Sequence, residues 1–184
     1  MTLLGPYLVA CALLAIAGSS KAARPRHTAT VLVQLFPSLR PLAVKRSVRV
    51  FALAEALLGV VSALFPYPAL AAAVAGSYLG FALFVLYLRA RVGASADCGC
   101  ISADGASTRL HILVNLAMAA SAASVAWAGA GRWIFSVLSN QVLDGVPLIA
   151  ACAACSWLLV LSLVALPRLS AAREALQQRS TGAV

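Results

Sequence analysis

The chain of 184 residues contains little charge, and least of all negative charge. Only 10% of its residues are charged, with five acidic residues against 14 basic ones. An average soluble domain has about 25% charged residues, so this chain lacks the polar surface that a soluble protein of its size needs. It also has no phosphate-binding glycine loop, no Ser/His/Asp arrangement and no paired carboxylates. These absences leave no support for nucleotide binding or for the common hydrolytic mechanisms.

Long apolar runs take the place of the missing charge. Hydrophobic residues make up 62% of the chain, in continuous runs rather than in the alternating pattern of transmembrane β-strands. A helix needs about 20 apolar residues to cross a bilayer. The sequence therefore predicts an all-α integral membrane helix bundle of about five transmembrane helices, a four-helix core plus one, without a soluble domain. The expected spans are 3–20, 49–66, 69–88, 110–129 and 147–166.

The basic residues indicate how these spans are oriented. They lie between apolar runs rather than on a folded basic face, so we expect no nucleic-acid partner. With five spans, 13 of the 14 basic residues lie on one side of the membrane, in the connections on that side or in the tail at 167–184. Arg132 is the exception. Cytoplasmic connections are rich in Lys and Arg, which predicts an external N-terminus and a cytoplasmic C-terminus. Few lysines and much alanine suggest a GC-rich bacterial genome, and hence the bacterial cytoplasmic (inner) membrane.

The basic segment at 21–48 follows the first span. Pro25, Pro37 and Pro41 bracket an apolar stretch at 31–36 that is too short to cross the bilayer. We expect it to lie in the membrane interface, with its basic residues near anionic headgroups. Anchoring of the topology is the simpler role for these charges, and we prefer it to a specific lipid site.

Two thiols one residue apart, Cys98 and Cys100, lie in the polar loop between the third and fourth spans. Gly99 gives the backbone the freedom that a disulfide across so tight a loop requires. Strained disulfides are easily reduced, as catalytic or regulatory ones are. Arg109 would raise the thiolate fraction and Asp97 would lower it. The pattern favours a redox dithiol over two ordinary thiols in a reducing compartment.

A second cysteine pair, Cys152 and Cys155, begins the fifth span near its outer end. At i and i+3 the two thiols share one side of a helix, which allows a secondary redox pair. Free cysteine also packs as a small apolar residue, and that structural role is the alternative for this pair. The single Cys11 in the first span is expected to serve packing alone.

Glu55 is the one acidic residue inside an expected span. A carboxylate in the bilayer is costly and usually has a partner or faces the bundle interior. His111 and Asn115 share a face at the start of the fourth span. With Arg109 they are expected to meet Glu55 beneath the dithiol loop and to handle protons for thiol–disulfide exchange. The alternatives are an interfacial histidine without a role and an interhelical hydrogen bond from Asn115.

With these features the chain resembles the MauE/DoxX-type family of redox-associated membrane proteins. Three features carry the resemblance: Lys21 with the proline-containing stretch that follows it, Glu55 within 51–59, and the 97–100 dithiol before the helix start at Arg109 and Asn115. The resemblance covers most of residues 1–130. It implies a role in supplying or removing reducing equivalents for exported proteins, often beside a thioredoxin-like partner.

The resulting hypothesis is a membrane thiol–disulfide relay. A cytoplasmic-side donor reduces the Cys98–Cys100 disulfide, Glu55 and His111 handle protons, and electrons pass to Cys152/Cys155 or to a partner's dithiol and then to an exported protein. No cofactor is required. Three alternatives stay open: a quinone-coupled thiol oxidoreductase using Cys152/Cys155, similar in outline to the vitamin K epoxide reductase bundle; a protein that binds or transports a soft metal (Cu, Hg or Zn); and a non-catalytic assembly subunit.

Overall fold

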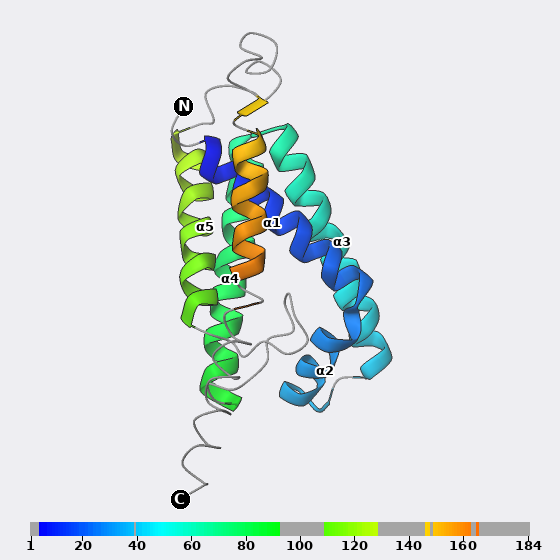
Figure 1. Cartoon of the computed structure of the whole chain (residues 1–184). Coiled ribbons are helices and arrows are strands. Elements are labelled where there is room, and N and C mark those ends of the chain that lie inside the picture. Colours follow the sequence, from blue (N-terminus) through cyan, green and yellow to red (C-terminus); the bar gives the residue numbers. More distant parts are fainter. Residues whose placement is uncertain are drawn as a thin grey trace, which may run out of the picture.

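The computed structural model describes residues 4–38, 40–92, 109–128, 146–147, 149–162 and 165. All elements of this part are helices, and four of them are long and apolar enough to cross a membrane. The predicted all-α membrane bundle is thus confirmed, with a shorter apolar helix, Ile149–Ser162, where the fifth span was expected. In chain order the labelled helices are α1 (Leu4–Ala23), α2 (Pro25–Leu35), α3 (Pro41–Leu64), α4 (Pro68–Val92) and α5 (Arg109–Ala128) (Figure 1).

Prolines determine where the helices begin and end. A residue that precedes proline is disfavoured in the helical conformation, whereas proline itself suits the first helical position. Arg40, for example, is extended (φ −71°, ψ 121°) and Pro41 opens α3. The other residues of this kind, each outside a helix and each before a proline, are Arg24, Phe36, Phe65 and Tyr67. Consequently α3 begins at Pro41 rather than at 49, and the basic segment 21–48 contains α2 and the first turns of α3.

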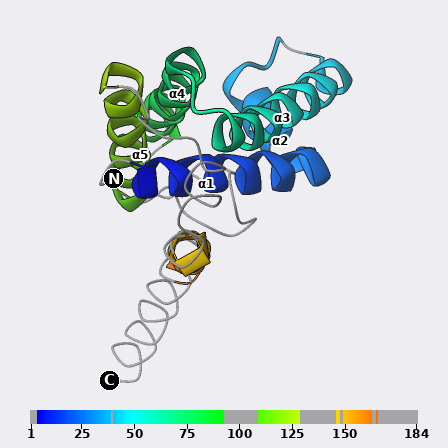
Figure 2. The same ribbon diagram turned by 90° about the horizontal axis from the view of Figure 1, so that it is seen from above.

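The long helices form two closely packed pairs, α1 with α3 and α4 with α5, while α3 and α4 touch little beyond the short turn that joins them. Seen from the side and from above, α1 runs obliquely across the bundle from α5 towards α3 (Figures 1 and 2). The short helix α2 packs at the end of the bundle opposite the α3–α4 turn (Figure 1). The splayed arrangement leaves space between α3 and α4 towards the α2 end.

Two glycines bring α1 and α3 into backbone contact. A Cβ atom on Gly18 would lie 2.6 Å from the Ala56 nitrogen, and one on Gly59 would lie 2.6 Å from the Cys11 carbonyl oxygen. Small residues at such crossings let membrane helices approach closely. In α4, by contrast, a Cβ on Gly76 or Gly80 would meet no atom within 4 Å. The close crossing is therefore a property of α1 and α3.

The buried core joins α1, α4 and α5 towards the end of the bundle where α1 begins. The hydroxyl of Tyr78 donates to the carbonyl of Ala10 at 2.6 Å, and that of Tyr7 donates to the carbonyl of Ser62 at 3.2 Å. Both phenols are thus hydrogen-bonded where water is excluded. Cys11 is fully buried in this core, which confirms the expected packing role. The remaining buried members are Leu14, Ala71, Val74, Ala75, Ala119, Ala122 and Val125.

Large apolar side chains cover the outside of the bundle. They include Phe51, Leu57, Leu83, Leu113 and Trp127, all more than half exposed. An apolar surface of this kind is stable in lipid and unstable in water. The bilayer is therefore a partner of this chain.

The helix Ile149–Ser162 lies against α1 and runs in the same direction. Near its start the Cys152 thiol donates to the carbonyl of Gly5 at 3.6 Å, and near its end Val160 borders a cavity with Leu13 and Ile16. Its direction is the one that the expected fifth span would have. Ser156, on the same helix, is buried and donates to the Cys152 carbonyl at 2.8 Å.

Candidate functional site

A buried ion pair joins α1 to α3. The ammonium nitrogen of Lys21 lies 2.7 Å from Oε2 of Glu55, and the two side chains are only 8% and 20% exposed. Lys21 is one turn beyond Gly18, and Glu55 is one turn before Gly59. The glycine crossing therefore brings these two side chains together. The expectation that Glu55 has a partner is confirmed, and that partner is Lys21.

The Lys21 ammonium has a second contact on α4. It lies 3.9 Å from the centroid of the Phe81 ring, within the range of a cation–π interaction. The charge is thus held between a carboxylate on α3 and an aromatic face on α4. Because an unpaired charge in the bilayer is costly, these contacts stabilise Lys21 in its buried position.

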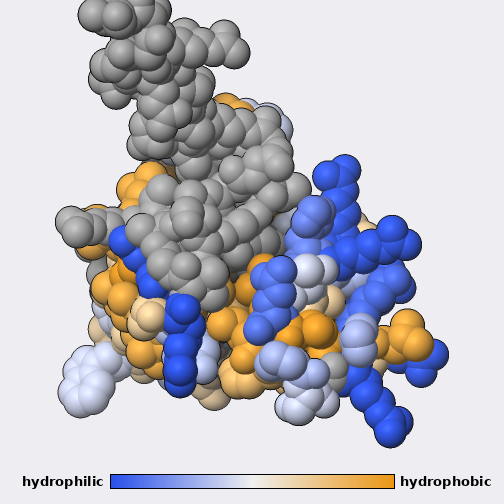
Figure 3. Space-filling model, turned by 90° about the horizontal axis from the view of Figure 1, so that it is seen from below, coloured by the Kyte–Doolittle hydropathy of each residue, from blue (hydrophilic) through white to orange (hydrophobic). Residues whose placement is uncertain are grey.

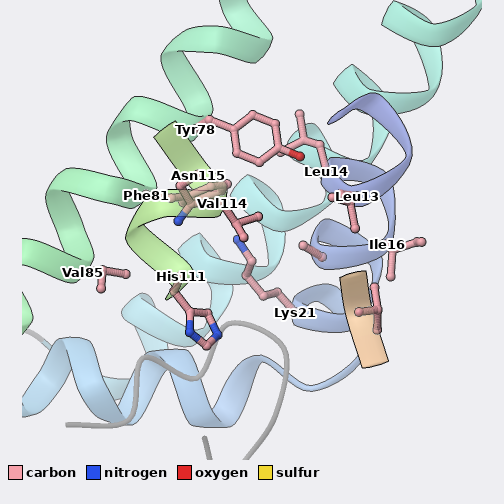
Figure 4. Close-up of a pocket in the computed structure, with 12 residues that line it drawn as sticks. Leu13, Leu14, Ile16, Lys21, Tyr78, Phe81, Val85, His111, Val114 and Asn115 are labelled. Carbon is pink, nitrogen blue, oxygen red and sulfur yellow. The ribbon is translucent and has the colours of Figure 1, made fainter. Parts of the chain in front are cut away.

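A small cavity lies on the α5 side of Lys21. Its volume is about 50 Å³, and Figure 4 shows the side chains of Lys21, His111 and Asn115 directed towards it. A water molecule needs roughly 10–15 Å³ of such space together with polar partners, so this cavity accommodates water. His111 is buried in the first turn of α5. The structure therefore brings His111 and Asn115 to Lys21, and through Lys21 to Glu55.

A larger cavity, of about 420 Å³, lies on the other side of the ion pair. Lys21 and Phe81 line both cavities, whereas Glu55 lines only the larger one. The side chains of Phe51 and Phe84 also line the larger cavity. Its size and its apolar lining with a few polar groups are typical of small-molecule sites. Lys21 thus separates a water-sized space from a space of ligand size.

Cys98 and Cys100 lie outside the described residues, together with Asp97 and Gly99. The side chain of Arg109 is not described either. The segment that carries these cysteines joins Val92, the last residue of α4, to the start of α5. Both helix ends lie at the α2 end of the bundle, where Val31 and Ile112 pack around Val85 and Leu88 of α4. The dithiol segment is therefore attached at the same end as His111.

The second cysteine pair is not brought to this site. Cys152 is half-buried against α1, Cys155 is exposed, and both are free thiols. Cys152 contacts Gly5 in the first turn of α1, whereas Lys21 is in the last turn of the same helix. At 1.5 Å per residue this separation is about 24 Å along α1. Among the described residues, no three His, Cys, Asp or Glu side chains gather as a metal site would require.

Lys21 is the site residue that the sequence pattern did not predict. It entered only as part of the family resemblance, while the groups expected around Glu55 were His111, Asn115 and Arg109. A signal was present, because Glu55 within a span needs a cation and Lys21 is the first one after the preceding span. Arg49 of α3 does not pair with Glu55; its Nε donates to the carbonyl of Ala22 at 3.3 Å.

Fold and site together define a multi-pass membrane helix bundle with a buried ion pair near the attachment of a dithiol segment. The chain belongs to the MauE family: residues 1–128 match the family described as methylamine utilisation protein MauE. The match includes both halves of the ion pair, His111 and the dithiol, and it ends before Cys152. No curated protein and no solved structure matches the chain. The family resemblance predicted from the sequence is thus confirmed.

Proposed function

We propose that this chain is a membrane thiol–disulfide redox protein whose Cys98/Cys100 dithiol passes reducing equivalents between a cytoplasmic-side donor and exported proteins. The observation that carries the proposal is the gathering of Lys21, Glu55 and His111 near the helix ends to which the dithiol segment is attached. Thiol–disulfide exchange needs groups that take up and release protons. Membership of the family described as methylamine utilisation protein MauE supports a redox role.

The proposed cycle uses two exchange reactions. A thiolate of the donor attacks the Cys98–Cys100 disulfide and forms a mixed disulfide with one of the two cysteines. The donor's second thiol then attacks this mixed disulfide and displaces that cysteine. The donor leaves as a disulfide, and its two electrons and two protons remain on Cys98 and Cys100. One of these thiols then attacks a disulfide on a thioredoxin-like partner, so that the partner is reduced and Cys98–Cys100 is formed again. The partner in turn reduces an exported protein.

His111 and the ion pair serve as the proton-handling groups of this cycle. A leaving thiolate takes a proton, and an attacking thiol gives one up. In the proposal His111 exchanges these protons, and the water-sized cavity connects His111 to Lys21, which is paired with Glu55. Glu55 holds Lys21 in position beside that cavity. In the proposal Asn115 orients the polar side chains of Lys21 and His111, which border the same cavity.

The acceptor that we propose is a dithiol on the partner rather than Cys152/Cys155. Cys152 is about 24 Å from the level of Lys21 along α1, while exchange requires direct contact between sulfurs. The partner's dithiol must therefore reach Cys98 and Cys100 at the α2 end and then reach the exported protein at the opposite face, which requires a membrane-spanning partner. In this proposal Cys152 and Cys155 serve packing, as free cysteines in apolar helices do.

Alkylation of the partner in cells tests the proposal. In cells with Cys98→Ala/Cys100→Ala we expect the thioredoxin-like partner to accumulate as a disulfide, whereas the matched variant Cys152→Ala/Cys155→Ala leaves it reduced. The single variant Cys98→Ala has no disulfide for the donor to attack, so its Cys100 thiol should attack the partner's disulfide and retain the partner as a mixed disulfide with Cys100. An unchanged redox state of the partner in the Cys98/Cys100 variant, with the protein present in the membrane, would rule the proposal out.

A quinone-coupled thiol oxidoreductase is the second candidate, and the larger cavity favours it. A cavity of about 420 Å³ lined by phenylalanines beside the ion pair suits a flat, lipid-soluble ring with carbonyl acceptors. In that case oxidation of the dithiol to the disulfide supplies two electrons and two protons, which convert the quinone to the quinol. Quinone reduction by the purified, reduced chain, lost in Cys98→Ala/Cys100→Ala, would favour this candidate over the relay.

A further inference from the structure

A cleft at the junction of α1, α2 and α3 collects basic side chains from three parts of the chain. Arg24 lies between α1 and α2, Arg26 and His27 lie in the first turn of α2, and Lys45 and Arg49 share a face of α3. The volume of the cleft is about 380 Å³. Seen from the α2 end, hydrophilic side chains stand together over α2 and the start of α3 (Figure 3).

The charge of this cleft is not balanced by the described residues. None of the described residues that line it is acidic, and Glu55, the one acidic side chain in the described part of the chain, is paired with Lys21. Like charges held around one hollow repel each other. A bound anion with more than one negative charge removes that repulsion.

Backbone groups add to the positive potential. The cap residue of α2, Arg24, makes no side-chain hydrogen bond to the first turn. The first N–H groups of a helix have no partner within the helix and carry the positive end of its dipole. Arg24, Pro25 and Arg26 line the cleft, so this helix start faces it. Arg49 is held across the junction by its hydrogen bond to the Ala22 carbonyl.

The depth of the cleft identifies the anion. On α3 large apolar side chains are exposed in succession from Val50 onward, with Val50 and Phe51 exposed by 66% and 71%, whereas before Arg49 the one exposed large apolar side chain of the helix is Leu42. The cleft is therefore at the level where the apolar surface gives way to the polar interface. Phosphate-bearing lipid headgroups are concentrated at this level, and basic pockets between membrane helices are known to bind multiply charged ones.

We propose that the cleft formed by Arg24, Arg26, His27, Lys45 and Arg49 is a specific binding site for an anionic phospholipid headgroup with more than one negative charge. The site goes beyond the orienting effect of basic residues, because it depends on where the charges lie and not only on their number. It is separate from the cysteines and stands whether or not the dithiol cycles.

The test compares two variants of equal charge. Arg24→Gln/Lys45→Gln removes two charges from the cleft, and Arg46→Gln/Arg91→Gln removes two from the same end of the bundle outside it. The full chain is purified in neutral detergent, and its thermal unfolding is followed as cardiolipin, phosphatidylglycerol, phosphatidylcholine or inorganic phosphate is added. Binding to the folded state raises the unfolding temperature.

We expect cardiolipin to stabilise the native chain most, phosphatidylglycerol less, and phosphatidylcholine not at all. Each basic residue near an anionic surface contributes about fivefold in affinity, so the cleft variant should bind cardiolipin roughly twentyfold more weakly than the native chain, and the control variant within about twofold of it. The charge-keeping variant Arg24→Lys/Lys45→Arg should retain most of the binding, and it keeps the test valid if the cleft variant does not fold.

Two outcomes would overturn the proposal. Equal losses in the cleft and control variants would mean that only the total charge of this end matters. Stabilisation by inorganic phosphate equal to that by cardiolipin would mean that the cleft recognises a free anion and not a lipid.

Discussion

At the scale of single residues, Lys21 and Glu55 explain how charge is accommodated inside the bundle. Each alone would be an uncompensated buried charge, and together they form a pair that Phe81 completes from α4. Replacement of one member of a buried pair usually costs much more than replacement of both, because the remaining charge stays buried without its partner. This asymmetry gives the pair a measurable signature.

We predict that Lys21→Met or Glu55→Gln alone lowers the free energy of unfolding by about 3–5 kcal/mol. The double variant should lose clearly less than the sum of the two, because neither charge remains. Reversible unfolding of the purified protein in detergent, analysed as a double-mutant cycle, measures this coupling. Strictly additive losses would show that the two side chains do not depend on each other.

At the scale of helices, the crossing of α1 and α3 positions the pair. The Gly18 and Gly59 contacts leave no space for a Cβ, while the surroundings of Gly76 and Gly80 are open. Glycine inside a helix is less favourable than alanine by about 1 kcal/mol. The same substitution should therefore act in opposite directions at these two kinds of position.

We predict that Gly18→Ala and Gly59→Ala each destabilise the folded chain by about 1–3 kcal/mol, the usual cost of overpacking. Gly76→Ala and Gly80→Ala should be neutral or stabilise it by up to about 1 kcal/mol. Thermal unfolding of the four variants under one condition makes the comparison. Similar effects at all four positions would contradict a close crossing that is specific to α1 and α3.

At the scale of the whole molecule, the basic residues mark one end of the bundle. Lys45, Arg46 and Arg49 lie in the first turns of α3, and Arg89 and Arg91 lie in the last turn of α4. These turns are at the same end, the one where α2 packs (Figure 1). Because basic residues collect on the cytoplasmic side, we propose that this end faces the cytoplasm of a bacterial inner membrane.

We predict that a membrane-impermeant maleimide labels Cys98 and Cys100 in inverted vesicles but not in intact cells. In the proposed cycle labelling increases after reduction, since resting molecules carry the disulfide. A variant with serine at both positions shows the background from the other three cysteines. Labelling from the outside of intact cells would reverse the proposed orientation.

The sequence by itself determined the class of protein and most of the helix boundaries. Continuous apolar runs have no stable alternative to membrane helices, and each X–Pro step disfavours a helical residue at its own position in the chain. These are local effects, so they can be predicted without knowing which helices touch. The extended start of α3 does not follow from the sequence, because its first turns are basic and resemble the interfacial segment before them.

The partner of Glu55 and the shapes of the cavities were decided only by the tertiary structure. Lys21 and Glu55 are 34 residues apart in the chain, and they meet because two glycines let α1 cross α3 at backbone distance. The basic cleft likewise depends on α2 folding back beside α3. Such contacts between distant segments follow from the packing of whole helices, which residue type and spacing along one segment do not specify.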